Sequence, residues 1–385
     1  MDLARDSYVD SDVRLARSLP GVAFTDPHFL RLETATIFQH CWMMLPPTDE
    51  SDLSLEENGV QVPLSILDTP LFLQRDWQGH LHCFPNICTH AWHPLVERTG
   101  IAKTITCPIT CPQHGRRFEC DGRFLSHPGF KDLPGFPNER DHLQELSLEK
   151  WGQFHFVTFD KPIAPLNDFL RDVTQSIVNL PVARMKQVHH KLESRTLEGN
   201  WKQHAWNYMD NFHIRFVHKG PDGLAGAVNL HTYHTELYKW SALQWVYAQE
   251  PEDGFEPDQL PTRFIDREHV DRRVFALWWF IFPNLTLNFY PWGLSINIYS
   301  PSIEDPGKTR FQWYHCVMDE DKYERKDEVW LDEQVDSEDV EAIANVNRGV
   351  QSGFAPRGRF SPTEEIGPHW LHRLIYENVA KQFQT

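Results

Sequence analysis

Two short pairs of metal-ligand residues constrain this chain more than any other feature. Cys88 and His90 form a Cys-x-His pair, and Cys111 and His114 form a Cys-x-x-His pair further along the chain. Thiolate and imidazole ligands suit either zinc or an iron–sulfur cluster. In a cluster of mixed ligation, two cysteines hold one iron and two histidines hold the other. On spacing alone, the sequence leaves both a structural Cys2His2 zinc site and a redox cluster open.

Composition narrows the class of protein. The 385 residues are enough for two domains with separate cores, and 41% hydrophobic with 24% charged residues is typical of a globular protein. A formal net charge of −17, without any Lys/Arg-rich run, argues against nucleic acid as a partner. The N-terminus lacks the layout of a signal peptide, and no uninterrupted apolar stretch approaches the roughly 20 residues of a spanning helix. We therefore expect a soluble, cytoplasmic protein that has no membrane partner.

The cysteines point to a metal site rather than to a disulfide framework. There are seven, and five of them lie between residues 83 and 120. An odd number scattered through a long chain is not typical of a secreted disulfide scaffold. Cys107 and Cys120, which lie outside the two ligand pairs, are expected to be buried free thiols.

The pattern of strands and helices predicts an α+β protein. Residues 1–39 are expected to form an N-terminal helical segment, with helical character from about 8 to 40, that packs with the second domain. Residues 40–160 are predicted to form an antiparallel β-module from short runs at 60–67, 71–75, 80–84, 104–107, 117–120 and 154–159. Residues 161–385 are predicted to form a domain with a curved antiparallel sheet, built from runs at 232–248, 273–282, 285–290, 294–300 and 309–318, with flanking helices at 200–217, 336–350 and 368–382.

The context of the cysteine–histidine pairs carries a resemblance. The run Cys111-Pro-Gln-His114-Gly-Arg-Arg-Phe, with Asp-Gly-Arg-Phe at 121–124, resembles the second cluster loop and following hairpin of Rieske iron–sulfur domains, and Cys88-Thr-His90 resembles the first loop. The resemblance implies that Cys88, His90, Cys111 and His114 bind a [2Fe-2S] Rieske cluster. The chain departs from many relatives after His90, where Arg-Gly is common. We interpret His93 as a packing or hydrogen-bonding residue.

A second group of candidate ligands lies near residue 210. Two histidines and a carboxylate on one face of Fe(II) leave coordination positions open for O2 and substrate. Asp210 and His213 are three residues apart and share a helix face. His213 and His218 are separated by about 140° on an ideal helix, so both can face one metal only if the predicted helix bulges or ends between them. Taken alone, two exposed or core histidines are an equally good interpretation.

This segment resembles the catalytic domain of Rieske non-haem iron oxygenases. The match rests on Asn-Trp-Lys at 200–202, followed by the Asn-Tyr-Met-Asp-Asn-Phe-His run that ends at His213. It implies that His213 and His218 bind iron and that Asp210 bridges to the cluster of a neighbouring subunit. The third iron ligand is expected to be Asp339, with Asp336 as the fallback. Glu338 is interpreted as a charge at the start of the helix.

The resemblance, which spans about residues 35–380, also implies a function. It indicates the terminal oxygenase (alpha) subunit of a ring-hydroxylating or quaternary-amine oxygenase, with a helix-grip-like catalytic domain, a [2Fe-2S] cluster and a mononuclear Fe(II). The implied partners are an NAD(P)H-dependent reductase and/or a ferredoxin, O2, a small organic substrate and two further copies in a homotrimer.

The substrate class stays open on sequence alone. Hydroxylation of an aromatic or related substrate is the leading hypothesis. O- or N-demethylation of a methoxyaromatic or quaternary ammonium (betaine) compound is the alternative, and a zinc-stabilised binding protein is the non-enzyme alternative. Asn207, Tyr208, Phe282 and Phe289 are the candidate pocket residues. A cationic substrate would favour an aromatic cage, which this composition permits.

Overall fold

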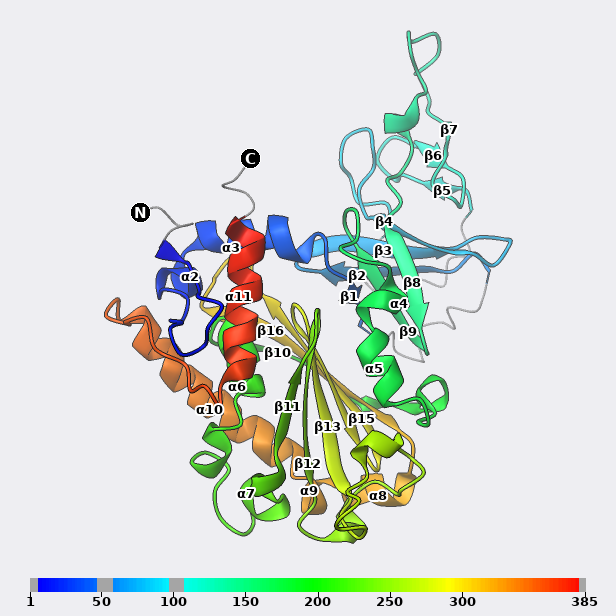
Figure 1. Ribbon diagram of the computed structural model, residues 1–385. Helices are drawn as coiled ribbons and strands as arrows, with labels where there is room; N and C mark the ends of the chain where they lie inside the picture. Colours follow the sequence, from blue (N-terminus) through cyan, green and yellow to red (C-terminus); the bar gives the residue numbers. More distant parts are fainter. Residues whose placement is uncertain (1–5, 47–57, 97–106, 381–385) are drawn as a thin grey trace. The chain divides into compact units, whose positions relative to one another are not determined.

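The computed structural model describes residues 6–46, 58–96 and 107–380 (Figure 1). The chain divides into a small unit, Trp42–Ile163, and a large unit that combines Met1–Cys41 with Ala164–Thr385. The sequence-based boundaries lie at 39/40 and 160/161. Of the strand predicted at 104–107, residues 104–106 lie outside the described residues.

The small unit is built from short antiparallel strands. Its described residues form three three-stranded sheets, ordered β1-β9-β8, β2-β3-β4 and β5-β6-β7. The strands are β1 (Met43–Met44), β2 (Gln61–Ile66), β3 (Thr69–Arg75), β4 (Leu81–Pro85), β5 (Ile109–Thr110), β6 (Arg117–Phe118), β7 (Phe124–Ser126), β8 (Ser147–Trp151) and β9 (Phe154–Thr158). Phe72, Phe84 and Phe118 form a buried cluster that also contains Cys88 and Cys111. The two cysteines are therefore held by the core of this unit.

Cys107 and Cys120 form a disulfide, so the prediction of two free thiols is wrong. The pairing of Ile109 with Phe118 in the β5–β6 hairpin places residues 107 and 120 opposite each other. Their Cα atoms are 5.5 Å apart, within the range that a disulfide spans. The sequence analysis missed the pair because its predicted strand at 104–107 lies before the observed hairpin.

The large unit contains a seven-stranded antiparallel sheet, ordered β10-β16-β15-β14-β13-β12-β11. Its strands are β10 (Lys186–Glu198), β11 (His234–Leu237), β12 (Ser241–Tyr247), β13 (Val274–Ile281), β14 (Leu285–Tyr290), β15 (Gly293–Pro301) and β16 (Lys308–Val317). Every residue of β12, β13 and β14 is buried. Continuous burial, in place of strict alternation, indicates that both faces of the sheet are covered.

Three helices cover one face of this sheet (Figure 1). They are α6 (Trp201–Met209), α10 (Asp332–Gln351) and α11 (Ile366–Ala380). The helix α6 contacts α10, α11 and β15. Gly367 permits the close approach of α11, since a Cβ there would lie 2.9 Å from the carbonyl oxygen of Met209. The shorter α-helices of its C-terminal part, Ala164–Thr385, are α4 (Leu166–Phe169), α5 (Arg171–Ser176), α7 (Leu224–Ala227), α8 (Glu320–Glu324) and α9 (Lys326–Val329).

The N-terminal segment is less helical than predicted. It contains α2 (Val22–Thr25), α3 (Pro27–Glu33) and a π-helical turn, η1 (Thr34–Phe38), whereas residues 8–21 form no regular helix. Glu33, at the end of α3, forms a fully buried ion pair with Lys202 of α6, 2.8 Å between Oε1 and Nζ. The same carboxylate accepts a hydrogen bond from the indole of Trp201. These contacts fasten the N-terminal segment to the helix that leads to the site.

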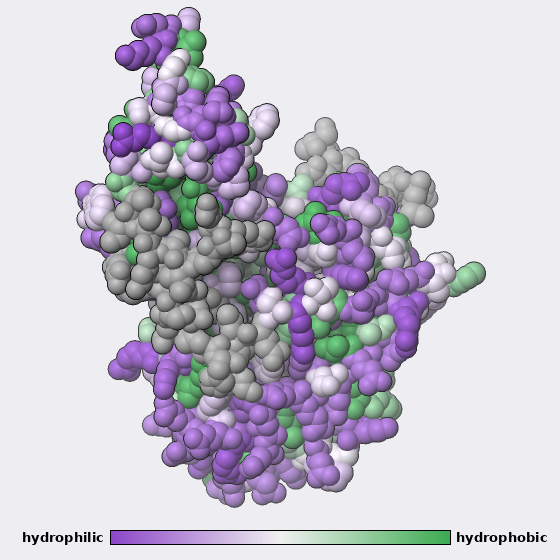
Figure 2. All heavy atoms as spheres, turned by 180° about the vertical axis from the view of Figure 1, so that it is seen from behind, coloured by the Kyte–Doolittle hydropathy of each residue, from purple (hydrophilic) through white to green (hydrophobic). Residues whose placement is uncertain are grey.

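Hydrophilic side chains predominate on the face shown in Figure 2, with apolar residues scattered among them. In the parts of the chain that the structure describes, none of the helices combines the length and the apolar character needed to cross a bilayer.

Candidate active site

The first candidate site lies on two loops of the small unit. One loop follows β4 and carries Cys88 and His90, and the other joins β5 to β6 and carries Cys111 and His114. Both cysteines are buried, and their sulfurs lie within hydrogen-bonding distance of each other. The rings of His90 and His114 lie 4.9 Å apart, centroid to centroid. The four side chains thus meet as a cysteine pair and a histidine pair, which is the donor arrangement of a mixed-ligand [2Fe-2S] cluster.

The backbone of the first loop is shaped to stabilise a thiolate. The N–H groups of His90 and Ala91 donate to the Cys88 sulfur, whereas burial raises the pKa of that thiol. Hydrogen bonds of this kind to sulfur are one of the means by which a protein tunes a cluster. His93 does not join the pairs; its Nδ1 lies 2.6 Å from the carbonyl oxygen of Pro94, as expected for a hydrogen-bonding residue.

The buried side chain of Arg116 stabilises the second loop. Its side chain is 2% exposed, pairs with Asp141 at 2.6 Å and lies over the rings of Phe118, Phe124 and Phe136. The carbonyl oxygen of Arg116 accepts the N–H of Cys111 at 2.7 Å. The buried guanidinium therefore holds the residue that closes the loop around Cys111.

The second site begins where α6 ends. Asn200 caps the start of the helix, with its side chain accepting the N–H of Lys202. The helix stops at Met209, and Asp210 has extended backbone angles, so the helix predicted over 200–217 is too long. Asp210 Oδ1 accepts the N–H of Phe212 at 2.7 Å. Asp favours such local turns over helix continuation. His213 therefore begins a separate 3-10 turn, η5 (His213–Arg215), and His218 follows it outside any regular helix.

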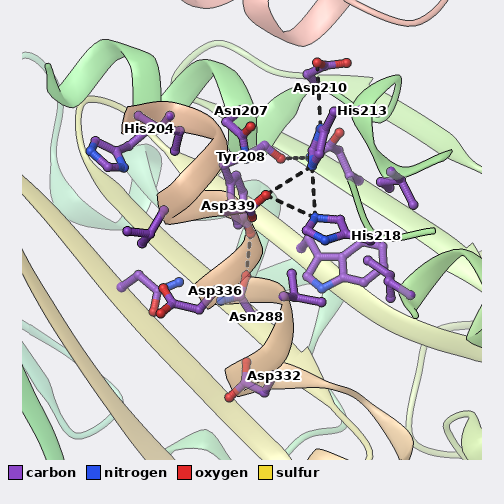
Figure 3. A pocket seen from close by; sticks show the side chains of 18 of the residues that line it. His204, Asn207, Tyr208, Asp210, His213, His218, Asn288, Asp332, Asp336 and Asp339 are labelled. Carbon is purple, nitrogen blue, oxygen red and sulfur yellow. Dashed lines mark hydrogen bonds and ion pairs between the residues drawn. The ribbon is translucent and has the colours of Figure 1, made fainter. Parts of the chain in front are cut away.

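This segment and α10 bring three donor atoms together (Figure 3). His213 Nε2 lies 3.2 Å from His218 Nε2 and 3.4 Å from Asp339 Oδ1, and His218 Nε2 lies 3.0 Å from Asp339 Oδ1. Metal bonds of about 2.1 Å set about 90° apart place their donor atoms about 3 Å from one another. Among the described residues, these three are the group of His, Cys, Asp or Glu side chains whose donor atoms converge in this way. These three donor atoms form a triangle, and the triangle fits a facial site for one metal ion.

The charges in the triangle also fit a cation. Asp339 Oδ1 is buried, and its contacts are with the two imidazoles. Burial opposes its ionisation, yet the two imidazoles hold the pKa of Asp339 well below its usual range. Burial likewise lowers the pKa of His213, but the carboxylates of Asp210 and Asp339 outweigh it and raise that pKa to about 10. A protonated His213 thus supplies positive charge of the kind that a metal would bring, and metal binding would release its proton.

The other carboxylates near the three donor atoms each have a different partner. Glu338 Oε2 lies 2.6 Å from His218 Nδ1, so its interpretation as a charge at the helix start is wrong; α10 begins at Asp332. Asp336, the fallback ligand, pairs with Arg195 instead. Asp210 Oδ2 approaches His213 Nδ1 at 3.7 Å, too long for a hydrogen bond. The sequence did contain a signal for the contact between Glu338 and His218. Glu338 directly precedes the predicted ligand Asp339, and both side chains reach the same histidine.

A cavity of about 110 Å³ opens beside the triangle. At about 10–15 Å³ for each water-sized group, it has room for a small organic molecule. Asn207 and Tyr208 line it, whereas Phe282 and Phe289 do not and are fully buried in the sheet region. The other aromatic rings of the lining are Tyr233, Trp278, Tyr290, Tyr299 and Trp330, and its carboxylates are Asp210, Asp332, Asp336 and Asp339.

Sequence reasoning missed Asp332 and Trp330 as lining residues. The spacing of Asp332, Asp336 and Asp339 was the available signal, because residues four and seven apart share a helix face. Phe282 and Phe289 were chosen for their aromatic character, which the sheet uses for packing.

Comparison with known proteins assigns the family. Residues 182–381 match the family described as ring hydroxylating alpha subunit (catalytic domain), and residues 42–137 match the Rieske [2Fe-2S] domain. The chain belongs to the ring-hydroxylating alpha subunit family. The expected fold class, enzyme class and cofactors are confirmed: this member is the terminal subunit of a Rieske oxygenase, with a [2Fe-2S] cluster and a mononuclear iron, and it takes electrons from a partner protein.

Proteins similar to this ring-hydroxylating alpha subunit include monooxygenases that are named for quaternary ammonium compounds and a dioxygenase that is named for naphthalene. It is 25% identical to a chloroplastic choline monooxygenase of Arabidopsis thaliana, covering 94% of this chain and 83% of the relative. It is also 25% identical to a carnitine monooxygenase oxygenase subunit of Acinetobacter baumannii, covering 99% and 98%. Among solved structures, a quaternary ammonium Rieske monooxygenase superposes with a TM-score of 0.74 at 19% identity, covering 97% and 98%. A naphthalene 1,2-dioxygenase superposes with a TM-score of 0.71 at 20% identity, covering 99% and 95%. At these identities, the two structures show the shared fold.

Proposed function

We propose that this oxygenase oxidises a small quaternary ammonium compound. The observation that carries the proposal is the lining of the cavity, which combines six aromatic rings with four carboxylates and contains no Lys or Arg among the described lining residues. Ring faces attract cations, most strongly where water is excluded, and carboxylates supply the opposite charge. The choline and carnitine monooxygenases among its relatives act, by their names, on quaternary ammonium compounds. Of the two substrate hypotheses, the lining supports the alternative over aromatic-ring hydroxylation.

We further assign the metal ligands within this function. His213, His218 and Asp339 would hold the iron, and Cys88, His90, Cys111 and His114 would hold the cluster. The iron, when bound, supplies activation of O2. Glu338 accepts the Nδ1–H of His218 and so leaves its Nε2 lone pair facing the metal position. Tyr208 donates its hydroxyl hydrogen to Asn288 Oδ1 at 2.5 Å, which fixes its ring as a wall of the cavity beside Asn207.

Asp210 is proposed as the bridge for electrons that arrive from the cluster of a neighbouring copy. Its carboxylate lies near Nδ1 of His213, while Asp339 faces Nε2 of the same ring. Asp210 therefore adjoins the iron position through one imidazole. This role requires an oligomer, which we propose to be a homotrimer, acting in the cytoplasm with an NAD(P)H-dependent reductase and/or a ferredoxin as the electron donor.

Metal analysis and a substrate screen test the function. The purified protein should absorb in the visible range and contain acid-labile sulfide, together with iron in excess of the cluster. A screen with a surrogate reductase should follow O2 uptake and product mass for choline, carnitine, glycine betaine, naphthalene and a methoxybenzoate. Turnover of a quaternary ammonium compound supports the proposal. Turnover confined to the aromatic compounds overturns the proposed substrate class, and formaldehyde release would identify demethylation.

A further inference from the structure

The end of the cavity remote from the iron position contains a buried carboxylate, that of Asp332. Asp332 is the first residue of α10 and lies at the opposite end of the labelled side chains from Asp210 and His213 (Figure 3). Seven residues separate it from Asp339, which is about 10 Å along a helix axis. Its side chain is 10% exposed. Its Oδ2 contacts His315 Nε2 at 2.8 Å, and no described residue donates a hydrogen bond to its Oδ1.

Asp332 forms no ion pair with a described Lys or Arg, and its partner is His315. His315 Nδ1 lies 3.0 Å from the hydroxyl of Tyr323. Burial raises the pKa of Tyr323, so the hydroxyl keeps its proton and can donate it to Nδ1. An imidazole ring that accepts at Nδ1 and donates its Nε2–H to Asp332 satisfies both contacts. Asp332 also lies in the first turn of a long helix, where an anion is favoured. The result is a buried carboxylate with one oxygen free to meet a ligand.

Aromatic rings line the same cavity as this carboxylate, and Tyr290 lies close enough to feel its charge. Trp278, Tyr290 and Trp330 line the cavity and belong to one buried cluster with Phe275. Their polar edges are engaged elsewhere: Trp278 Nε1 donates to the hydroxyl of Tyr290, and Trp330 Nε1 donates to the carbonyl oxygen of Asp253. The ring faces and the hydroxyl hydrogen of Tyr290 remain for a ligand. Ring faces suit a quaternary ammonium group, whose methyl groups surround a positive charge.

We propose that this end of the cavity, formed by Asp332, Trp278, Tyr290 and Trp330, is the subsite for the substrate's ammonium group. The inference rests on the proposed function and adds an orientation to it. At the metal end, the carboxylates of Asp339, Asp210 and Glu338 adjoin the two histidines, and a divalent iron would largely offset their charge. Asp336, between the two ends, is already neutralised by Arg195.

Two consequences follow for the substrate. A carboxylate on the substrate would lie in a cavity that has four acidic residues and no Lys or Arg among its described lining, so a cation with a neutral arm is favoured over a zwitterionic betaine.

The carbon presented to the metal end is also remote from the nitrogen, rather than one of its methyl groups. At that carbon, one atom of O2 enters a C–H bond as hydroxyl and the other leaves as water, with two electrons from the partner protein and two protons. On choline this gives the aldehyde hydrate rather than formaldehyde.

Titration calorimetry on the oxidised holoenzyme, without reductant, tests the subsite. The ligands are choline, its neutral isostere 3,3-dimethyl-1-butanol, and glycine betaine. The wild type should bind choline at least about tenfold more tightly than the neutral alcohol. Asp332→Asn keeps an acceptor for His315 and should lose most of this preference, while its relative affinity for glycine betaine rises. Glu341→Gln removes one charge from an exposed position of the same helix, outside the cavity, and should preserve the wild-type ratios.

The outcomes separate the two proposals. If choline binds but Asp332→Asn keeps the full preference for it, the subsite is overturned while the substrate class stands. If none of the three titrated ligands binds and the substrate screen shows turnover of naphthalene, the substrate class and the subsite are overturned together. Trp330→Leu is a second variant in case Asp332→Asn fails to fold, and it should weaken choline more than the alcohol. Formaldehyde as the main product from choline would contradict the proposed orientation.

Discussion

Glu338 Oε2 lies 2.6 Å from Nδ1 of His218, while Oδ1 of the adjacent Asp339 lies 3.0 Å from Nε2 of the same ring. Two consecutive residues of α10 thus contact the two nitrogens of one imidazole. A carboxylate on Nδ1–H fixes the tautomer that presents Nε2 to a metal and increases its basicity. Glu338 is therefore expected to strengthen iron binding without being a ligand.

The variant Glu338→Gln tests this expectation. The amide oxygen can still accept the Nδ1–H, but it carries no charge, so we expect iron affinity to fall by about tenfold or more. Iron content after dialysis against a graded chelator measures the loss, and sulfide content should stay at the wild-type level. Glu341→Gln serves as the control on the same helix. Equal iron retention in the two variants would contradict the role of Glu338.

Asp210→Asn should separate metal binding from turnover. Asn can keep the turn by accepting the N–H of Phe212, so iron and sulfide contents should match the wild type. The loss of the charge beside His213 should reduce steady-state turnover by about 100-fold or more. Oxygen uptake with substrate and reductase gives the rate, and dithionite reduction of the cluster gives its integrity. Asp222→Asn, on an exposed neighbouring turn, is the matched control. Wild-type turnover by Asp210→Asn would rule out the bridging role.

Sequence motifs brought out candidate ligands whose side chains converge, whereas the backbone around them was predicted less well. His213, His218 and Asp339 were singled out through a resemblance that depends on residue type and order, and their donor atoms meet in the structure. The end of α6 was missed because periodicity continues through Phe212 and Phe216, whereas the side chain of Asp210 turns the chain. Phe216 is in fact 66% exposed. The hydrogen bond between Asp210 and the N–H of Phe212 therefore ends the helix, although the apolar periodicity of the sequence continues.

The cavity could be predicted only in part. Asn207 and Tyr208 lie on the helix that leads to the histidines, so proximity in sequence was informative. Trp330, at the end of α9, and Asp332, the first residue of α10, reach the same cavity. Their contribution depends on how these helices pack against the sheet. The disulfide between Cys107 and Cys120 was likewise set by hairpin register, which composition and spacing do not report.

The buried pair of Glu33 and Lys202 leads to a stability prediction. Both side chains are 0% exposed, so Glu33→Gln would leave a buried ammonium without its counter-charge. We expect the free energy of unfolding to fall by about 3–5 kcal/mol. Denaturant titration measures it, and adding Lys202→Met to the variant should recover part of the loss. Glu377→Gln breaks a surface pair with Arg373 and should cost less than about 1 kcal/mol. Similar losses in the two single variants would show that burial of the first pair is not decisive.

His372 on α11 should make the protein less stable in mild acid. Its ring is fully buried, its Nδ1 accepts the N–H of Leu19 at 2.9 Å, and burial lowers its pKa to about 3. An unfolded histidine titrates near pH 6.5. Below that pH the unfolded chain binds a proton that the folded protein does not, so stability is full above about pH 6.5 and falls by about 1.4 kcal/mol per pH unit as the pH decreases toward the folded pKa.

The variant His372→Asn isolates this contribution. Asn keeps an acceptor for the N–H of Leu19 but does not titrate, so the loss of stability between pH 7 and pH 5.5 should be smaller than in the wild type by about 1 kcal/mol. His231→Asn, at an exposed position, should keep the wild-type dependence. The free energy of unfolding at the two pH values is the measurement, and the comparison between variants cancels proton uptake elsewhere. An unchanged pH dependence in His372→Asn would mean that this imidazole is already protonated, or accessible to protons, in the folded protein.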